Sequence, residues 1–165
     1  MSRFLELILS LFLLIFLSFL FFIIFILIKL TSFGPAIHWS KRVGVDNIIY
    51  LMPKFRTMRM DTPNVATHLL QDPNNYTFAF GRFLRSTSLD ELPQIYSIII
   101  GDMTFVGPRP ALFNQYDLIN LRSAKGLQNI KPGITGLAQI NGRDLNSIHE
   151  KVQLDEQYMK NKNFF

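Results

Sequence analysis

The stretch LILSLFLLIFLSFLFFIIFILI, residues 7–28, decides the architecture of this chain. It holds 22 consecutive residues without a charge, and Ser10 and Ser18 are its only polar members. At about 1.5 Å per residue, a helix of this length crosses the ~30 Å hydrocarbon layer of a bilayer. The run is about twice as long as the apolar core of a signal peptide and lacks a small-residue cleavage site. The sequence therefore predicts a retained membrane helix within residues 1–30.

Residues 31–165 have the composition of one domain with a single packed core. They carry 15 Lys and Arg against 11 Asp and Glu, a net charge of +4. Such an excess suits an anionic membrane surface or a phosphate-rich substrate, but it is too small for the basic stripe of a nucleic-acid-binding protein. Basic residues also follow the apolar run more closely than they precede it, which places the domain in the cytoplasm.

Several classes of site are excluded by residues that the chain lacks. It has no cysteine, so disulfides, thiolate metal sites and cysteine nucleophiles are ruled out. His38, His68 and His149 show no metal-ligand spacing, and we interpret them as surface or packing residues. Neither a Walker A loop nor a G-x-G-x-x-G motif is present, which excludes the common nucleotide-binding folds. A catalyst must therefore use oxygen or nitrogen groups.

Periodicity and turn residues predict an α+β domain in which helices dominate. Two short apolar segments, PAIHWS and NIIYLM, are separated by turn-forming residues and predict a small β-hairpin next to the membrane. The other expected elements are a loop over residues 61–77, a helix over 78–86, a buried helix after Ser88, a short strand from Thr104, a helix over 113–124, a structured loop over 131–143, and a last helix from Asn146 or Ser147 to about Lys160.

The stretch RSTSLDELPQ, residues 85–94, places two carboxylates side by side. Ser88 and Glu91 have the spacing of a capping box, in which each side chain bonds the other's backbone amide. Acidic residues in a first turn also oppose the helix dipole. Taken alone, this fragment favours a structural role for Asp90 and Glu91 over a chemical one.

Five cationic side chains stand in loops or at the edges of predicted elements. A guanidinium matches a phosphate with two parallel hydrogen bonds, so several converging arginines suit a diphosphate. For any one of them alone, an ordinary surface charge is the better interpretation. The five are Lys54, Arg56, Arg85, Arg109 and Arg143.

The motifs KRVG, KFRTM, RSTSLDELPQ, GDMTFVGPRP and KPGITGLAQINGR occur in this order between residues 41 and 143. With them the chain resembles the small monotopic phosphoglycosyl transferases, the bacterial sugar transferases that start glycan assembly on a polyprenyl carrier. The resemblance implies transfer of a sugar 1-phosphate from a UDP-sugar to undecaprenyl phosphate, with release of UMP. It also implies a protein of the bacterial inner membrane whose catalytic domain, residues 31–165, lies on the cytoplasmic face.

The resemblance further implies roles for individual residues. Asp90 matches the nucleophile that forms an aspartyl-phosphosugar intermediate, and Glu91 matches its partner in binding Mg²⁺ and in handling the polyprenyl phosphate. A carboxylate can attack a diphosphate only if the negative charge is neutralised, so a magnesium ion on Asp90 and Glu91 agrees with the chemistry. Lys54, Arg109 and Arg143 match basic positions of the family motifs that face the phosphates, and Arg56 and Arg85 complete the expected substrate-binding set.

The chain departs from the family pattern in three places. Ser18-Phe19 stands where a helix-breaking Ser-Pro pair is expected, so a straight spanning helix becomes an alternative to a re-entrant one. Pro53 replaces an aromatic residue, and the chain is shorter at its C-terminus than family members. A non-catalytic, membrane-anchored binding protein is therefore a second hypothesis. The sugar, the glycan pathway (O-antigen, capsule, exopolysaccharide or glycoprotein glycan) and the oligomeric state are left open by these motifs.

Overall fold

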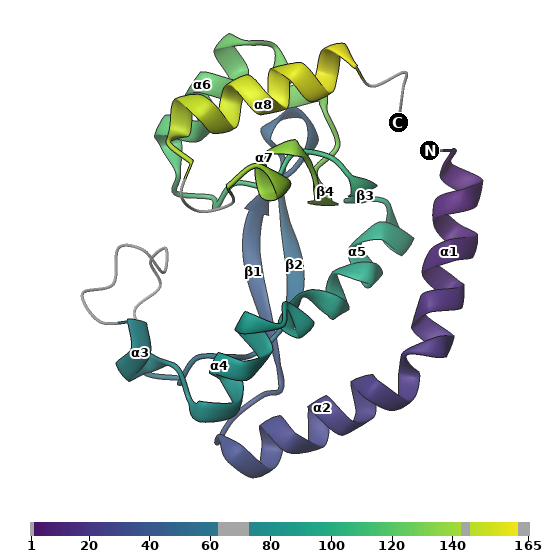
Figure 1. The fold of residues 1–165 in the computed structure, drawn as a ribbon, viewed down its shortest axis with the longest axis vertical. Helices are drawn as coiled ribbons and strands as arrows, with labels where there is room; N and C mark the ends of the chain where they lie inside the picture. The colour runs from purple at the N-terminus through teal and green to yellow at the C-terminus, as the bar shows by residue number, and fades with distance from the viewer. Residues whose placement is uncertain (1, 63–72, 143–145, 162–165) are drawn as a thin grey trace.

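The computed structural model describes residues 2–62, 73–142 and 146–161. The protein has the predicted helix-dominated α+β architecture, with a long β-hairpin at its centre (Figure 1). Two N-terminal helices run along one flank, and the C-terminal helix lies across the opposite end of the hairpin. The hairpin thus connects the N-terminal helices with the C-terminal part of the chain.

The apolar run forms two helices, α1 (Arg3–Phe16) and α2 (Ser18–Thr31), bent by 58° at Leu17. The straight-helix alternative drawn from the missing proline is therefore wrong. Leu17 leaves the helical region with φ −91° and ψ 2°, and the Ser18 hydroxyl donates to the Ile15 carbonyl at 2.7 Å. A serine that bonds back to the preceding turn bends a helix, so Ser18 supplies a cause of the bend without proline.

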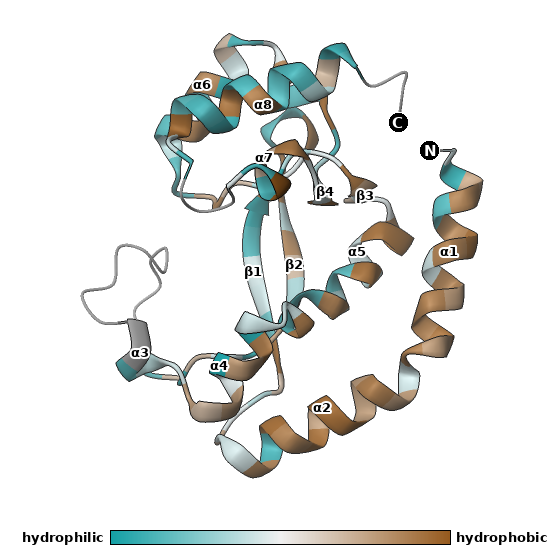
Figure 2. Ribbon diagram, viewed as in Figure 1, coloured by the Kyte–Doolittle hydropathy of each residue, from teal (hydrophilic) through white to brown (hydrophobic). Residues whose placement is uncertain are grey.

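Both helices are hydrophobic along most of their length (Figure 2), and most of their large apolar side chains are exposed. Neither helix alone has the length and apolar character needed to cross a bilayer, whereas the bent pair together does. On the inner side, Ile24 and Ile28 pack with Phe55 and Leu84 in a buried cluster. The side chains exposed by 70% or more include Phe4, Ile15, Phe16, Phe19 and Leu30.

The predicted hairpin is confirmed, and each strand is longer than expected. Strand β1 (Ile37–Val43) pairs antiparallel with β2 (Ile49–Phe55). The turn contains the short 3-10 helix η1 (Val45–Asn47), in which Asp46 and Asn47 adopt φ values of 54° and 60°. Asparagine and aspartate tolerate this left-handed region better than most residues, which is why the DN pair closes the hairpin.

The middle of the chain forms α3 (Pro73–Tyr76), α4 (Ala79–Ser86), the 3-10 helix η3 (Leu89–Gln94) and α5 (Ile95–Ile100). The loop expected over residues 61–77 is wrong at Pro73–Tyr76, where the short helix forms, and residues 63–72 lie outside the described part. Helix α4 confirms the predicted helix. A Cβ on Gly81 would lie 2.2 Å from the Thr57 carbonyl oxygen, so α4 packs directly on the chain that follows β2.

A second, parallel pair joins β3 (Thr104–Val106) to β4 (Gly133–Thr135). The loop expected over residues 131–143 therefore contains β4 and the short helix α7 (Leu137–Ile140). Gly107 and Gly133 allow the two backbones to touch, because a Cβ on Gly133 would lie 2.1 Å from the Gly107 nitrogen. This close packing fixes the start of the loop that carries Arg109.

The C-terminal part consists of α6 (Tyr116–Ala124), the 3-10 helix η4 (Leu127–Asn129) and α8 (Ile148–Lys160). Helix α6 begins three residues later than the expected Phe113, and α8 confirms the predicted last helix. A buried ion pair between Arg122 and Asp155, 2.7 Å long, joins α6 to α8. A separate apolar cluster that includes Leu118 and Val152 fills the space between these helices.

Candidate active site

Asp90 and Glu91 lie in η3, directly after a strained residue. Ser88 has a φ of 58°, in the left-handed region, and its side chain does not cap η3. The Glu91 carboxylate bonds other partners, and the Glu91 amide donates to the Ser88 carbonyl at 3.1 Å. The predicted capping box is therefore wrong, because Glu91 is used elsewhere.

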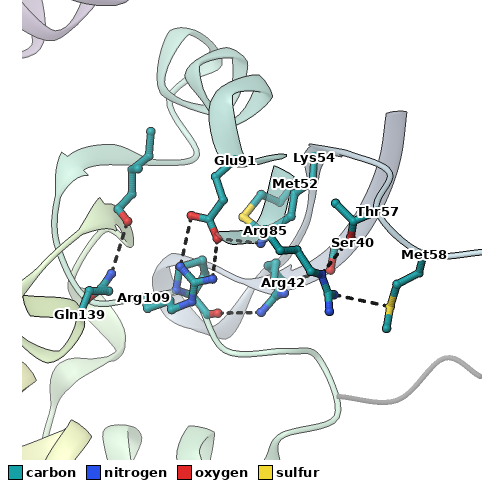
Figure 3. A network of polar contacts seen from close by, with 12 residues as sticks. Ser40, Arg42, Met52, Lys54, Thr57, Met58, Arg85, Glu91, Arg109 and Gln139 are labelled. Atoms are coloured by element: carbon teal, nitrogen blue, oxygen red, sulfur yellow. Dashed lines mark hydrogen bonds and ion pairs between the residues drawn. The ribbon is translucent and has the colours of Figure 1, made fainter. Parts of the chain in front are cut away.

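Two cations from distant parts of the chain hold the Glu91 carboxylate (Figure 3). Lys54 Nζ, from β2, lies 3.0 Å from Glu91 Oε1. Arg109, from the loop after β3, donates to the same oxygen at 2.6 Å and to Oε2 at 3.3 Å. The structure thus brings three of the predicted site residues into one network of charge-assisted hydrogen bonds.

Burial and charge shift the pKa values of this network in opposite directions. Burial alone would raise the pKa of Glu91, but Lys54 and Arg109 outweigh it and hold that pKa well below its usual range. Burial is also the main reason that the pKa of Lys54 falls to about 8, with Glu91 acting against it. Glu91 is therefore ionised at neutral pH, whereas Lys54 begins to lose its proton slightly above it.

Asp90 lies beside Glu91, but its pKa is raised rather than lowered. Its residue is only 8% exposed, and burial raises the pKa of its carboxyl, while Lys54 is the strongest of the charges that lower it. Within the described residues, no ion pair within 4.0 Å joins Asp90 to a cation. A carboxylate that is desolvated, surrounded by positive charge and not held by a salt bridge is suited to act as a nucleophile.

Arg42 also belongs to the site, although it is not among the five cations predicted from the sequence. Its guanidinium donates to Ser40 Oγ and to the Pro110 carbonyl, each at 3.1 Å (Figure 3). Burial and the neighbouring Arg109 lower the pKa of Arg42 to about 10. Arg42 belongs to the KRVG motif and, like Lys54, faces the site, so the alternation of the strand could have indicated it.

Arg85 and Arg56, two of the remaining predicted cations, differ in their position relative to the site. Arg85 donates to Thr57 Oγ1 at 2.9 Å, and its charge lowers the pKa of Asp90, so it belongs to the edge of the site. Arg56 is 4% exposed, and its guanidinium donates to the Pro35 carbonyl and to Ser32. It ties the end of β2 to the end of α2, apart from the Glu91 network. Arg143 lies outside the described residues.

Asp90 and Glu91 are the expected ligands of Mg²⁺. Among the described residues, no group of three acidic, histidine or cysteine side chains could hold a metal ion. Asp90 and Glu91 alone fit an ion that takes its other ligands from substrate phosphates and water, as Mg²⁺ does. Both Glu91 oxygens are bonded to cations, so the ion would have to share this carboxylate with Arg109.

Comparison with known proteins gives a consistent assignment. Over 139 residues the chain is 40% identical to the galactosyl transferase CpsE of Streptococcus agalactiae, covering 76% of this chain and 30% of that protein. It is 36% identical to the uncharacterized sugar transferase EpsL of Bacillus subtilis, covering 100% of this chain and 80% of that protein. It is also 36% identical to the UDP-glucose:undecaprenyl-phosphate glucose-1-phosphate transferase of Escherichia coli, covering 97% of this chain.

The extent of these matches differs between the relatives. The chain spans about a third of the length of the streptococcal and Escherichia coli proteins, and four fifths of the Bacillus protein. The family match, in contrast, extends over residues 1–165. With the ordered motifs and the Asp90 and Glu91 site, this match shows that the chain belongs to the bacterial sugar transferase family.

Proposed function

We propose that this chain is a phosphoglycosyl transferase that moves a sugar 1-phosphate from a UDP-sugar to undecaprenyl phosphate. The observation that carries the proposal is the position of Asp90, a buried carboxylate without a salt bridge among the described residues, beside the Lys54, Glu91 and Arg109 network. Such a reaction starts the assembly of a surface glycan on a lipid carrier. The relatives named for glucose and galactose transfer support a UDP-hexose as the donor.

The first step is an attack by an Asp90 carboxylate oxygen on the β-phosphorus of the UDP-sugar. The new bond joins this oxygen to phosphorus, and the bond between the β-phosphorus and the bridging oxygen breaks, so that UMP leaves with the electron pair. Arg42, Lys54 and Arg109 bring positive charge to the diphosphate, which an anionic nucleophile could not otherwise approach. The product is an aspartyl-phosphosugar.

The second step returns Asp90 to its starting state. A phosphate oxygen of undecaprenyl phosphate attacks the phosphorus of the intermediate, and the bond from phosphorus to the Asp90 oxygen breaks. The products are undecaprenyl diphosphate sugar and free Asp90 carboxylate. Asp90 and Glu91 would hold Mg²⁺, which would supply neutralisation of negative charge at the phosphates.

We further propose that α1 and α2 enter and leave the bacterial inner membrane on its cytoplasmic side. Arg3, at the start of α1, donates to the Ile98 and Ile99 carbonyls at 2.6 and 2.7 Å, and Glu6 accepts a hydrogen bond from Thr104. Both ends of the bent pair therefore contact the same domain. A straight helix would carry Arg3 to the far side of the bilayer and break these contacts.

The experiment that tests the function measures UMP release by the full chain in nanodiscs with undecaprenyl phosphate, Mg²⁺ and a panel of UDP-sugars. We expect turnover with one donor and loss of turnover in Asp90→Asn, since an amide is not a nucleophile. Chelation of Mg²⁺ by EDTA should stop the reaction, and added Mg²⁺ should restore it. No UMP from folded protein with any donor would refute the proposal and favour the non-catalytic binding protein.

A further inference from the structure

His38 lies on the site face of the hairpin, although its spacing gave no sign of function. It is the second residue of β1 and stands directly opposite Lys54 in the register. Residues in such a pair point to the same face, with Cβ atoms about 5 Å apart. Because Lys54 Nζ binds Glu91, the imidazole lies one side chain away from the carboxylate network. Within residues 2–62, 73–142 and 146–161, no hydrogen bond joins the exposed His38 to another residue.

The position of His38 along the hairpin separates it from the arginines of the site. Helix α2 ends at Thr31 and β1 begins at Ile37, so the His38 and Lys54 pair is near the α2 end of the hairpin (Figure 1). Arg42 lies four residues further along β1 and bonds the loop that carries Arg109. The site therefore extends from His38, next to the apolar helices, to the Arg42 guanidinium, and Lys54 and Arg109 meet between them at Glu91 Oε1.

The two ends also differ in charge. The His38 side chain is partly open to solvent, and the desolvation of its less exposed part, followed by the charges of Lys54 and Arg42, lowers the pKa of His38, which favours the neutral imidazole. A neutral imidazole donates one N–H without adding a further cation beside Lys54. Two guanidiniums suit a diphosphate, whereas one ammonium with one neutral donor suits a single phosphate group.

We propose that His38 is a substrate-binding residue of the acceptor subsite, where its imidazole N–H donates a hydrogen bond to the phosphate monoester of the lipid acceptor. This inference rests on the proposed function, which supplies a phosphate that arrives from the membrane side. The donor diphosphate then occupies the end formed by Arg42 and Arg109. The acceptor phosphate reaches the intermediate from the end formed by His38 and Lys54.

The kinetic test separates the two substrates. In His38→Ala we expect the KM for undecaprenyl phosphate to rise about tenfold, the loss typical of a hydrogen bond to a charged group. The UMP released by the enzyme with the donor alone, before acceptor is added, should equal that of the parent. His38→Gln keeps an N–H donor and should recover most of the affinity. His149→Ala removes an exposed histidine on α8 and serves as the matched control.

Two kinetic results would overturn the inference. If His38→Ala reduces UMP release with donor alone and leaves the acceptor KM unchanged, the residue serves the donor. If both quantities equal those of His149→Ala, the residue serves neither substrate.

A binding experiment distinguishes failure of this inference from failure of the proposed function. Calorimetric titration of the full chain in phosphatidylcholine nanodiscs uses farnesyl phosphate, with farnesol and inorganic phosphate as separate arms. We expect farnesyl phosphate to bind, farnesol not to bind, and inorganic phosphate to bind more weakly. His38→Ala should weaken binding of farnesyl phosphate about tenfold.

The activity and binding results together distinguish the proposed function from the acceptor subsite. His38-dependent binding without UMP release refutes the proposed function but supports the subsite. UMP release with His38-independent binding refutes the subsite alone. If phosphatidylglycerol in the nanodisc competes with farnesyl phosphate for the site, the site binds lipid headgroups in general and the inference is overturned. Inorganic phosphate that binds as tightly as farnesyl phosphate would also overturn it.

Discussion

The segments Ser88–Glu91 and Ser147–Glu150 share the pattern Ser-x-x-Glu but have different structures. At the start of α8, Ser147 Oγ accepts from the Glu150 amide at 3.2 Å, and Glu150 accepts from the Ser147 amide at 2.7 Å. Ser147 has a φ of −60°, as a cap requires, whereas Ser88 has a φ of 58°. The same pattern forms a cap in one place and part of a candidate active site in the other.

The difference is explained by competing partners. Glu150 is exposed, and the Ser147 backbone and side chain lower its pKa. Glu91 instead lies within reach of Lys54 and Arg109. A cap contributes about 1 kcal/mol, while each hydrogen bond to a charged group contributes about 1.5 to 3 kcal/mol. Two cations therefore outcompete the backbone amide for the carboxylate.

The largest effect should come from Glu91→Gln, measured beside Glu150→Gln. We expect Glu91→Gln to lower the rate of UMP release by about 100-fold or more, because it removes the charge that orders Lys54 and Arg109. Glu150→Gln should leave that rate unchanged, since among the described residues the Glu150 carboxylate bonds the Ser147 amide at the start of its own helix. The comparison would be wrong if the two variants lost activity equally. Circular dichroism of both variants provides the control for folding.

A smaller effect is expected from pH, through Lys54. Because its pKa is about 8, raising the pH from 7 to 9 removes most of its charge and should raise the KM for undecaprenyl phosphate about tenfold. Lys54→Met should show a high KM for undecaprenyl phosphate that changes little over this range. An equally steep pH dependence in the variant would assign the titration to another group.

The lowered pKa of Lys54 also determines how the free energy of unfolding changes with pH. Folded Lys54 binds its proton less tightly than the unfolded chain, whose lysine has a pKa of 10.5. Its contribution to the free energy of unfolding should therefore rise as the pH increases from about 8 to 10.5, and this rise should be lost in Lys54→Met. Urea denaturation at a series of pH values measures it.

The smallest effect should come from the cap of α8. Ser147→Ala removes one half of the capping box and should lower the free energy of unfolding by about 1 kcal/mol. UMP release should be unchanged because the hydrogen bonds between Ser147 and Glu150 stay within the start of α8. Urea denaturation combined with the activity assay checks both expectations. A loss of activity without a loss of stability would contradict the purely structural role of Ser147.

The bend of the N-terminal helices shows a related limit of sequence reasoning. The absence of proline allowed a straight helix as well as a bent one. The structure shows a bent pair, with a serine hydroxyl bonded to the preceding turn and with Arg3 bonded to the end of α5. Ser18 was visible in the sequence, but the contact of Arg3 with residues 98–99 was not. The long-range contact makes the bent form the one that this domain can hold.

The sequence by itself determined the helix-dominated class, the hairpin, the start of the last helix near Asn146 or Ser147 and the ordered family motifs. These features depend on periodicity, turn residues and neighbours a few positions apart, so they can be seen in the order of residues. The tertiary structure alone decided which partners each charged residue received. Lys54 and Glu91 are 37 positions apart, and Glu91 and Arg109 are 18 apart. Only folding brings such residues together, and for the same reason it placed Arg42 in the site and Arg56 outside it.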